Sequence, residues 1–280
     1  MTANPADTAV ATRPGSPAQA DVATRSAPAD YPPPLLQPTE RGLAERFAER
    51  VGATNPVRVF LTAVLTGYLL LVSISIAIGL FFVHVILPSG GLAEWDADLN
   101  RRMADARTAF TVDLSWVGST LSGGHVIPFV IGVLLLVFAI RKKWLLAVYP
   151  LFLILVESGT YRATTIFVER ERPPVERLEG LPVDASYPSG HTAASLALYG
   201  GLLLLCATWV RRPWFTVLAA VLTIAIVAFV GWSRMLRGMH HLTDTIAGVG
   251  VGLAAIVVVV FAARAATAAA QNRRALEERA

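Results

Sequence analysis

Cysteine and charged residues are scarce in this chain, and each scarcity excludes a class of protein. Cys206 is the only cysteine and lies inside an apolar run, which excludes both a disulfide framework and a thiolate metal cluster. Charged residues make up 16% of the chain and hydrophobic residues 54%, a balance too apolar for an ordinary soluble domain. The net charge of +4 is mild, and the basic residues lie in short connections instead of one patch, which argues against nucleic-acid binding.

Long apolar runs are abundant instead. A run of about 20 apolar residues is long enough to cross the hydrocarbon core of a bilayer. The runs extend over 57–87, 116–140, 144–167, 191–210, 214–232 and about 242–263. The polar residues 92–114, with their scattered apolar positions, are typical of an interfacial segment. The sequence therefore predicts an all-α integral membrane protein with six transmembrane helices.

The two ends of the chain differ from this core. Residues 1 to about 40 are rich in Ala, Pro, Thr and Ser, so we expect them to be disordered. Leu43, Phe47 and Val51 then recur every four residues, which predicts an amphipathic helix on the membrane surface. We accordingly divide the chain into an N-terminal region, a six-span membrane domain and a C-terminal tail, at 1–55, 56–266 and 267–280.

The distribution of basic residues predicts the topology. Six spans place both termini on one side, and most basic connections fall on that side, which the positive-inside rule identifies as the cytoplasm. We expect the cytoplasmic membrane of a bacterium. A second group of arginines lies on the opposite face, where orientation does not explain them: Arg170, Arg172, Arg177, Arg234 and Arg237. An anionic ligand on the extracytoplasmic side is the natural explanation.

One polar turn opens directly into an apolar run. Ser189, Gly190 and His191 stand together where the fourth predicted helix begins. The free N–H groups and the helix dipole make such a start an anion site. The alternative is a plain helix cap with Ser189 as the N-cap residue.

Two further groups are predicted on the same face. One is the run from Arg170 to Pro173, and the other joins Ser233 and Arg234 to His240 and Asp244. Their i, i+4 spacing places His240 and Asp244 on one helix face, so that the Asp244 carboxylate can accept a hydrogen bond from one imidazole nitrogen of His240. The other imidazole nitrogen is then a nucleophile.

Two histidines with arginines supply what phosphoryl transfer needs without a metal: a nucleophile, an acid and fixed positive charge. Alternatively, the histidines are passive interfacial groups, Asp244 only starts a helix, and the arginines bind lipid headgroups.

The order of these groups resembles the three-part signature of the type 2 phosphatidic acid phosphatase (PAP2) family, related to bacterial acid phosphatases and vanadium haloperoxidases. The resemblance covers roughly residues 116–263 and implies a PAP2/haloperoxidase-like helical core. It implies that His240 attacks phosphorus to give a phosphohistidine, Asp244 orients it, and His191 protonates the leaving group. The implied phosphate-binding residues are Arg172, Ser189, Gly190 and Arg234, with Arg170 as a further candidate.

One position departs from the family pattern. Thr165 stands where the family usually has a lysine, seven residues before the arginine of Arg172-Pro173. Arg170 and Arg162 are candidates to replace the missing charge-assisted contact. Arg162, one helical turn before Thr165, alternatively neutralises Glu157.

Together these features predict a metal-independent phosphatase without a cofactor. Its expected substrate is a phosphate or diphosphate monoester at the outer leaflet, either phosphatidic acid-like or a polyprenyl diphosphate. The expected partners are this lipid and the membrane, and not nucleic acid. Two alternatives stay open: a membrane phosphatase or phosphotransferase for a small soluble phosphate, and a non-catalytic lipid-binding or transport homologue.

Overall fold

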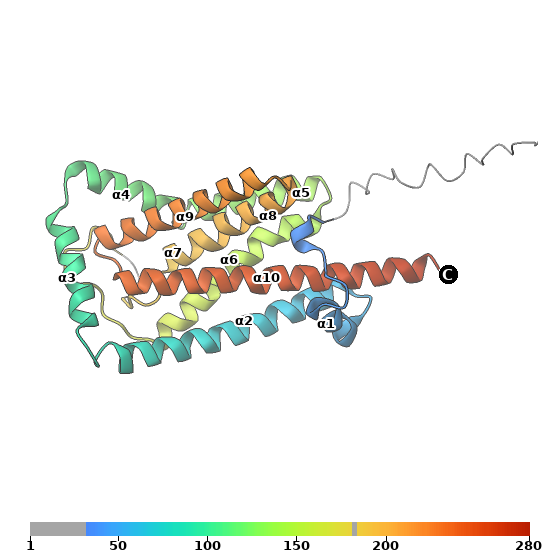
Figure 1. Ribbon diagram of the computed structural model, residues 1–280, viewed down its shortest axis with the longest axis horizontal. Coiled ribbons are helices and arrows are strands. Elements are labelled where there is room, and N and C mark those ends of the chain that lie inside the picture. Colours follow the sequence, from blue (N-terminus) through green and yellow to red (C-terminus); the bar gives the residue numbers. More distant parts are fainter. Residues whose placement is uncertain (1–31, 181–183) are drawn as a thin grey trace, which may run out of the picture. The chain divides into compact units, whose positions relative to one another are not determined.

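The structure, a computed structural model, describes residues 32–180 and 184–280, and its regular elements in these ranges are helical (Figure 1). The expected disorder of residues 1–40 falls mainly outside the described residues. Within them, six segments are long and apolar enough to cross a membrane: Pro56–Ile86, Ala109–Ile140, Trp144–Phe167, Gly190–Val210, Pro213–Leu236 and Leu242–Glu277. The all-α fold with six membrane-spanning segments is therefore confirmed.

Three of these six spans, the first, second and fourth, are not single uninterrupted α-helices. The first joins α2 (Pro56–Phe81) to the π-helical turn η3 (Phe82–Ile86), and the third is α6 (Trp144–Phe167). The fourth runs through α7 (Gly190–Ser195), the π-helical turn η4 (Leu196–Gly200) and α8 (Gly201–Val210). The fifth is α9 (Pro213–Leu236) and the sixth is α10 (Leu242–Glu277).

The second span begins earlier than the predicted residue 116, and it is broken. It consists of α4 (Ala109–Leu121) and α5 (Val126–Ile140). Thr108 caps the start of α4 in a capping box with Thr111, which accounts for the early start. Gly123 and Gly124 lie in the interval between the two helices, where glycine lowers helix propensity.

Both flanking regions pack against the membrane domain. The amphipathic helix is confirmed as α1 (Leu43–Gly52): its contact face holds Ala44 and Ala48 with Phe47 and Val51 packed beside them, while Leu43 is 76% exposed. These alanines cluster with Ala265 and Ala268, because small side chains let the two helices approach closely. α10 consequently continues to Glu277, well past the predicted end of the sixth span near residue 263.

α10 contacts α2, α6 and α7 and so lies at the centre of the membrane domain. Two glycines allow its close approach to the fourth span. A Cβ at Gly248 would lie 2.5 Å from the Ser189 backbone oxygen, and one at Gly252 would lie 2.7 Å from that of Ala193. The small-residue spacing thus brings the start of α10 beside the start of α7.

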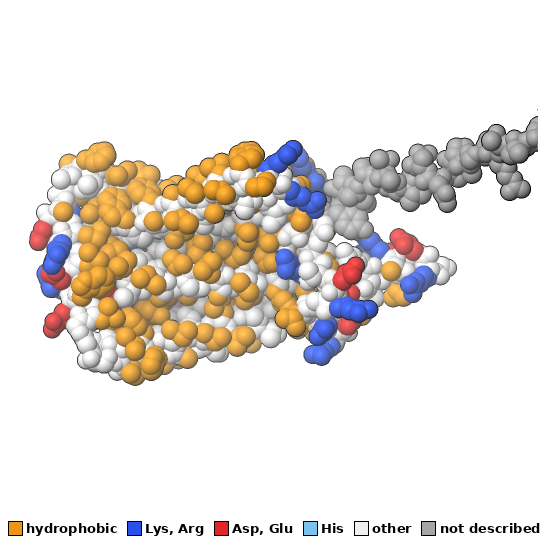
Figure 2. All heavy atoms as spheres, viewed as in Figure 1, with side chains coloured by type: hydrophobic (Ala, Val, Ile, Leu, Met, Phe, Trp, Pro, Cys, Tyr) orange, Lys and Arg blue, Asp and Glu red, His pale blue; other side chains and the backbone are white. Residues whose placement is uncertain are grey.

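The two ends of the spans differ in their charged residues. Basic side chains gather at the end from which the α10 C-terminus emerges (Figure 2), where Arg141, Lys143 and Arg212 flank the helix ends. The short helix α3 (Leu92–Asp105) crosses the other end (Figure 1). This second end, where α6 and α9 finish and α7 and α10 begin, holds the candidate site.

Candidate active site

Backbone hydrogen bonds join the three predicted groups at the end crossed by α3. The Ser186 N–H donates to the backbone oxygen of Arg170 at 2.8 Å, which ties the loop before α7 to the loop after α6. The Ser189 N–H donates to the backbone oxygen of Asp244 at 3.0 Å, which ties the start of α7 to α10. Residues more than 70 positions apart in the sequence therefore share one site, as the motif order predicts.

The His240 imidazole is only 2% exposed, in the turn between α9 and α10. Its Nδ1 lies 2.7 Å from the backbone oxygen of Ser186, and because a carbonyl only accepts, Nδ1 carries the proton. Burial, reinforced by the charges of Arg234 and Arg172, lowers the pKa of His240 well below its ordinary value. The imidazole is therefore neutral, with its lone pair on Nε2, which is the form a nucleophile needs.

Asp244 does not make the hydrogen bond that its spacing from His240 suggested. α10 begins at Leu242, so His240 precedes the helix and the i, i+4 geometry does not apply. The Asp244 carboxylate instead accepts the backbone N–H of His241 at 2.8 Å and the Ser186 hydroxyl. Asp244 thus caps α10 and holds the residue whose carbonyl orients His240.

Arg170 is buried in an ionic network beside Asp244. Its guanidinium donates to both Asp244 and Asp96, the latter at 2.9 Å, and to the Thr243 hydroxyl at 2.7 Å. It also lies over the Phe82 ring, 5.6 Å from the centroid. With these contacts Arg170 joins α3, α10 and the loop after α6. We therefore do not propose Arg170 as a phosphate-binding residue.

Arg234 is also buried, but fewer of its nitrogens have hydrogen-bond partners. It is 0% exposed, and its Nη1 donates to the Ser119 hydroxyl and, at 2.7 Å, to Glu179. Burial would raise the pKa of Glu179, but the charge and hydrogen bond of Arg234, with help from Ser119 and Arg237, lower it to about 2. Nε and Nη2 of Arg234 are buried and have no hydrogen-bond partner within the described part of the chain.

The other predicted phosphate-binding residues lie around the same turn. Arg172 donates to the backbone oxygens of Met239 and Ala185, the residues that directly precede His240 and Ser186. The Ser189 hydroxyl accepts the Thr192 N–H at 3.5 Å, so the N-cap interpretation of this residue is confirmed. Gly190 starts α7 against the Tyr161 ring, which would lie 3.1 Å from a Cβ there, and His191 follows, partly exposed.

The Thr165 position carries no substitute charge. Its hydroxyl donates to the backbone oxygen of Arg162 at 2.9 Å, within its own helix. Arg162 is exposed, and no ion pair joins it to Glu157 in the described residues. Glu157 is buried and accepts from the Ser158 hydroxyl at 2.8 Å. The alternative in which Arg162 neutralises Glu157 is thus not what the structure shows.

Sequence reasoning missed several residues that build the site. Ser119 and Glu179 accept hydrogen bonds from Arg234, and Asp96 accepts one from Arg170. The Ser186 carbonyl accepts from the His240 imidazole, and Asn100 donates to the backbone oxygen of His240. The i, i+4 spacing of Asp96 and Asn100 in a polar segment was the available signal. Among the residues described, no group of three or more His, Cys, Asp or Glu is placed to hold a metal ion.

Fold and site together define an integral membrane protein with a buried histidine facing arginines at one end of its spans. The family model of the PAP2 superfamily matches residues 146–267, a stretch that includes His191, His240 and Asp244. The resemblance to the PAP2 family seen in the sequence is therefore confirmed over residues 146–267. This match supports a membrane phosphatase.

A solved structure shares the fold. It is described as the first transmembrane PAP2 type phosphatidylglycerolphosphate phosphatase, from Bacillus subtilis. The two chains are 19% identical with a TM-score of 0.57, and the match covers 73% of this chain and 94% of the other. None of the curated proteins matches the sequence.

Proposed function

We propose that this protein is a membrane lipid phosphatase that hydrolyses a phosphate or diphosphate monoester through a phosphohistidine on His240. The observation that carries the proposal is the Arg234 guanidinium, which is buried with two of its nitrogens, Nε and Nη2, lacking a hydrogen-bond partner in the described structure. Leaving a buried donor unpaired costs about 1–3 kcal/mol, and more for a charged group. A phosphoryl group beside His240 would satisfy these donors.

The reaction follows from the protonation state of His240. Nε2 attacks phosphorus, the bond from phosphorus to the ester or anhydride oxygen breaks, and His191 gives its proton to the departing oxygen. Water then attacks the phosphohistidine, and His191 takes up a proton from that water, so that inorganic phosphate leaves and both histidines are restored. Arg234 and Arg172 supply positive charge to the phosphoryl oxygens, a contribution that is largest in a buried site.

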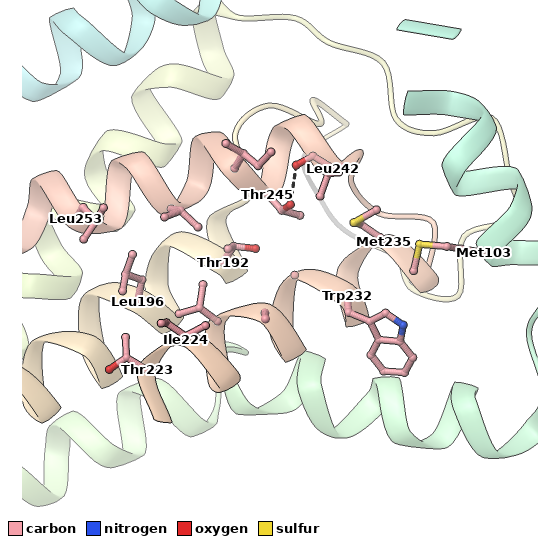
Figure 3. A pocket seen from close by; sticks show the side chains of 15 residues that line it. Met103, Thr192, Leu196, Thr223, Ile224, Trp232, Met235, Leu242, Thr245 and Leu253 are labelled. Carbon is pink, nitrogen blue, oxygen red and sulfur yellow. Dashed lines mark hydrogen bonds between the residues drawn. The ribbon is translucent and has the colours of Figure 1, made fainter. Parts of the chain in front are cut away.

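A groove beside the site supports a lipid substrate. It has a volume of about 600 Å³, lies between α9 and α10, and is lined almost wholly by apolar side chains such as Leu196, Ile224 and Leu253 (Figure 3). Thr192 and Met235, the residues after His191 and Arg234, also line it. A hydrocarbon chain in this groove would stay in the bilayer while its phosphate reaches His240.

We further propose that the site faces away from the cytoplasm, because the basic helix ends lie at the opposite end of the spans. Cysteines introduced by Asp184→Cys and Lys142→Cys in a Cys206→Ala background test this. In intact cells an impermeant thiol reagent should label the first and spare the second. The reverse pattern would overturn the proposed topology.

Phosphate release by the purified full-length protein in lipid vesicles tests the activity. The panel holds phosphatidic acid, phosphatidylglycerolphosphate and a polyprenyl diphosphate, with a soluble sugar phosphate as the comparison. We expect at least one lipid to give a kcat/KM well above that of the sugar phosphate. Preference for the sugar phosphate would favour a soluble substrate, and release from no compound would contradict the proposal.

A further inference from the structure

Helix α3 lies outside the stretch that matches the PAP2 superfamily, yet it crosses the end of the spans where the site lies (Figure 1). One face of this helix carries Asp96 and Asn100, four residues apart and both 0% exposed. A carboxylate and an amide that are completely buried, on a helix whose other residues are all exposed or partly exposed, need specific partners. These partners lie in the turn that carries His240.

Asp96 fixes the start of α10. Its Oδ1 accepts the backbone N–H of Leu242, the first residue of that helix, at 2.9 Å. Its Oδ2 accepts from the Thr243 hydroxyl and, at 2.9 Å, from Arg170. Since Arg170 also pairs with Asp244, one carboxylate from α3 holds both the helix start and the arginine that neutralises the Asp244 charge.

Asn100 fixes the turn before α10. Its Nδ2 donates to the backbone oxygen of His240 at 3.0 Å and to that of Met235 at 3.3 Å. These two carbonyls stand at the end of α9 and at the proposed nucleophile itself. The amide thereby holds the backbone of the turn, whereas the Ser186 carbonyl holds the His240 imidazole.

We propose that Asp96 and Asn100 are positioning residues for the His240 nucleophile, so that α3 is part of the active site without touching substrate. The inference rests on the proposed function, because that function is what makes His240 the nucleophile. Its mechanism is orientation: Ser186 fixes the imidazole tautomer, while α3 fixes the backbone from which the imidazole projects. A misplacement of about 1 Å in a reacting group can cost about a hundredfold in rate.

The test uses two variants and a matched control in the full-length protein. Asp96→Asn removes the charge that Arg170 pairs with, and Asn100→Leu keeps the branching at Cγ but removes both donated hydrogen bonds. Asp98→Asn is the control, because Asp98 lies on the exposed face of the same helix and pairs with Arg101 and Arg102. Steady-state kinetics and hydrogen exchange are measured for each variant.

We expect both variants to lower kcat about tenfold to a hundredfold with KM within about threefold of wild type. Amide exchange should quicken selectively in residues 236–243, while Asp98→Asn changes neither quantity. Unchanged kcat and exchange in both variants would overturn the inference. So would exchange that quickens equally along all spans, since this would show a general folding role.

The exchange measurement needs no turnover, which keeps the two proposals separable. If wild type releases phosphate from no substrate, the proposed function fails. The selective loosening of residues 236–243 would still support the positioning role of α3, and its absence would still refute it.

Discussion

Arg170 and Arg234 are both buried at the same end of the spans, but they differ in how their N–H groups are used. Arg170 belongs to a paired cluster with Asp96 and Asp244, in which two carboxylates surround one guanidinium. Arg234 belongs to an open cluster with His191 and His240, in which Glu179 and Ser119 engage only Nη1. We propose that this difference separates the residues that build the site from the residues that bind the anion.

The largest effect is expected for His240 in the open cluster. His240→Ala should abolish both turnover and covalent phosphate labelling with every substrate, because it removes the nucleophile. His84→Ala is the matched control, since His84 lies exposed in η3, and it should keep wild-type activity. Phosphoenzyme trapped by rapid acid quench measures the result, and labelling of the His240→Ala protein would assign the nucleophile elsewhere.

His191 should show a different kind of loss. His191→Ala should slow an alkyl phosphate by about 10²–10⁴-fold, because general-acid help matters most for a poor leaving group. A nitrophenyl phosphate, whose leaving group needs no proton, should recover part of this rate. His240→Ala should gain nothing from the same substrate, and equal recovery in the two variants would show that the roles are wrongly assigned.

Substitution of Arg234 should mainly lower activity, whereas substitution of Arg170 should mainly lower stability. Arg234→Met should lower kcat/KM about 10²–10³-fold, as loss of one charge-stabilising donor does, and should cost less stability than Arg170→Met because Glu179 keeps its ion pair with Arg237. Arg170→Met leaves Asp96 and Asp244 buried without their cation, and breaking such a pair costs about 3–5 kcal/mol of stability. Thermal unfolding alongside kinetics measures both. Similar losses of stability in the two variants would remove the distinction between the clusters.

The smallest expected effect is that of a chelator. The arginines of the open cluster supply the positive charge, so EDTA should leave kcat/KM unchanged. Vanadate should inhibit by taking the phosphoryl position. Full loss of activity in EDTA, restored by a divalent ion, would contradict a metal-independent reaction.

The sequence predicts the open cluster better than the paired cluster, for a physical reason. The apolar runs specify the spans, and the motifs near Arg172, His191 and His240 each stand at the end of a run, so their meeting at one face follows from alternation of the helices. The partner of His240 could not be predicted, because a shift of two residues in the helix start decides whether His240 lies inside α10 or before it. The role of Asn100 depends on packing across about 140 positions, which no local period encodes.

Anion binding by the open cluster is the central claim, and thermal unfolding with added inorganic phosphate tests it most directly. Binding to the folded state alone raises stability by about 2.7 kcal/mol at a hundred times the Kd. Phosphate should therefore raise the unfolding temperature of wild type and of Asp98→Asn, and the rise should vanish in Arg234→Met. An equal rise in Arg234→Met would show that the phosphate binds elsewhere and would contradict the account.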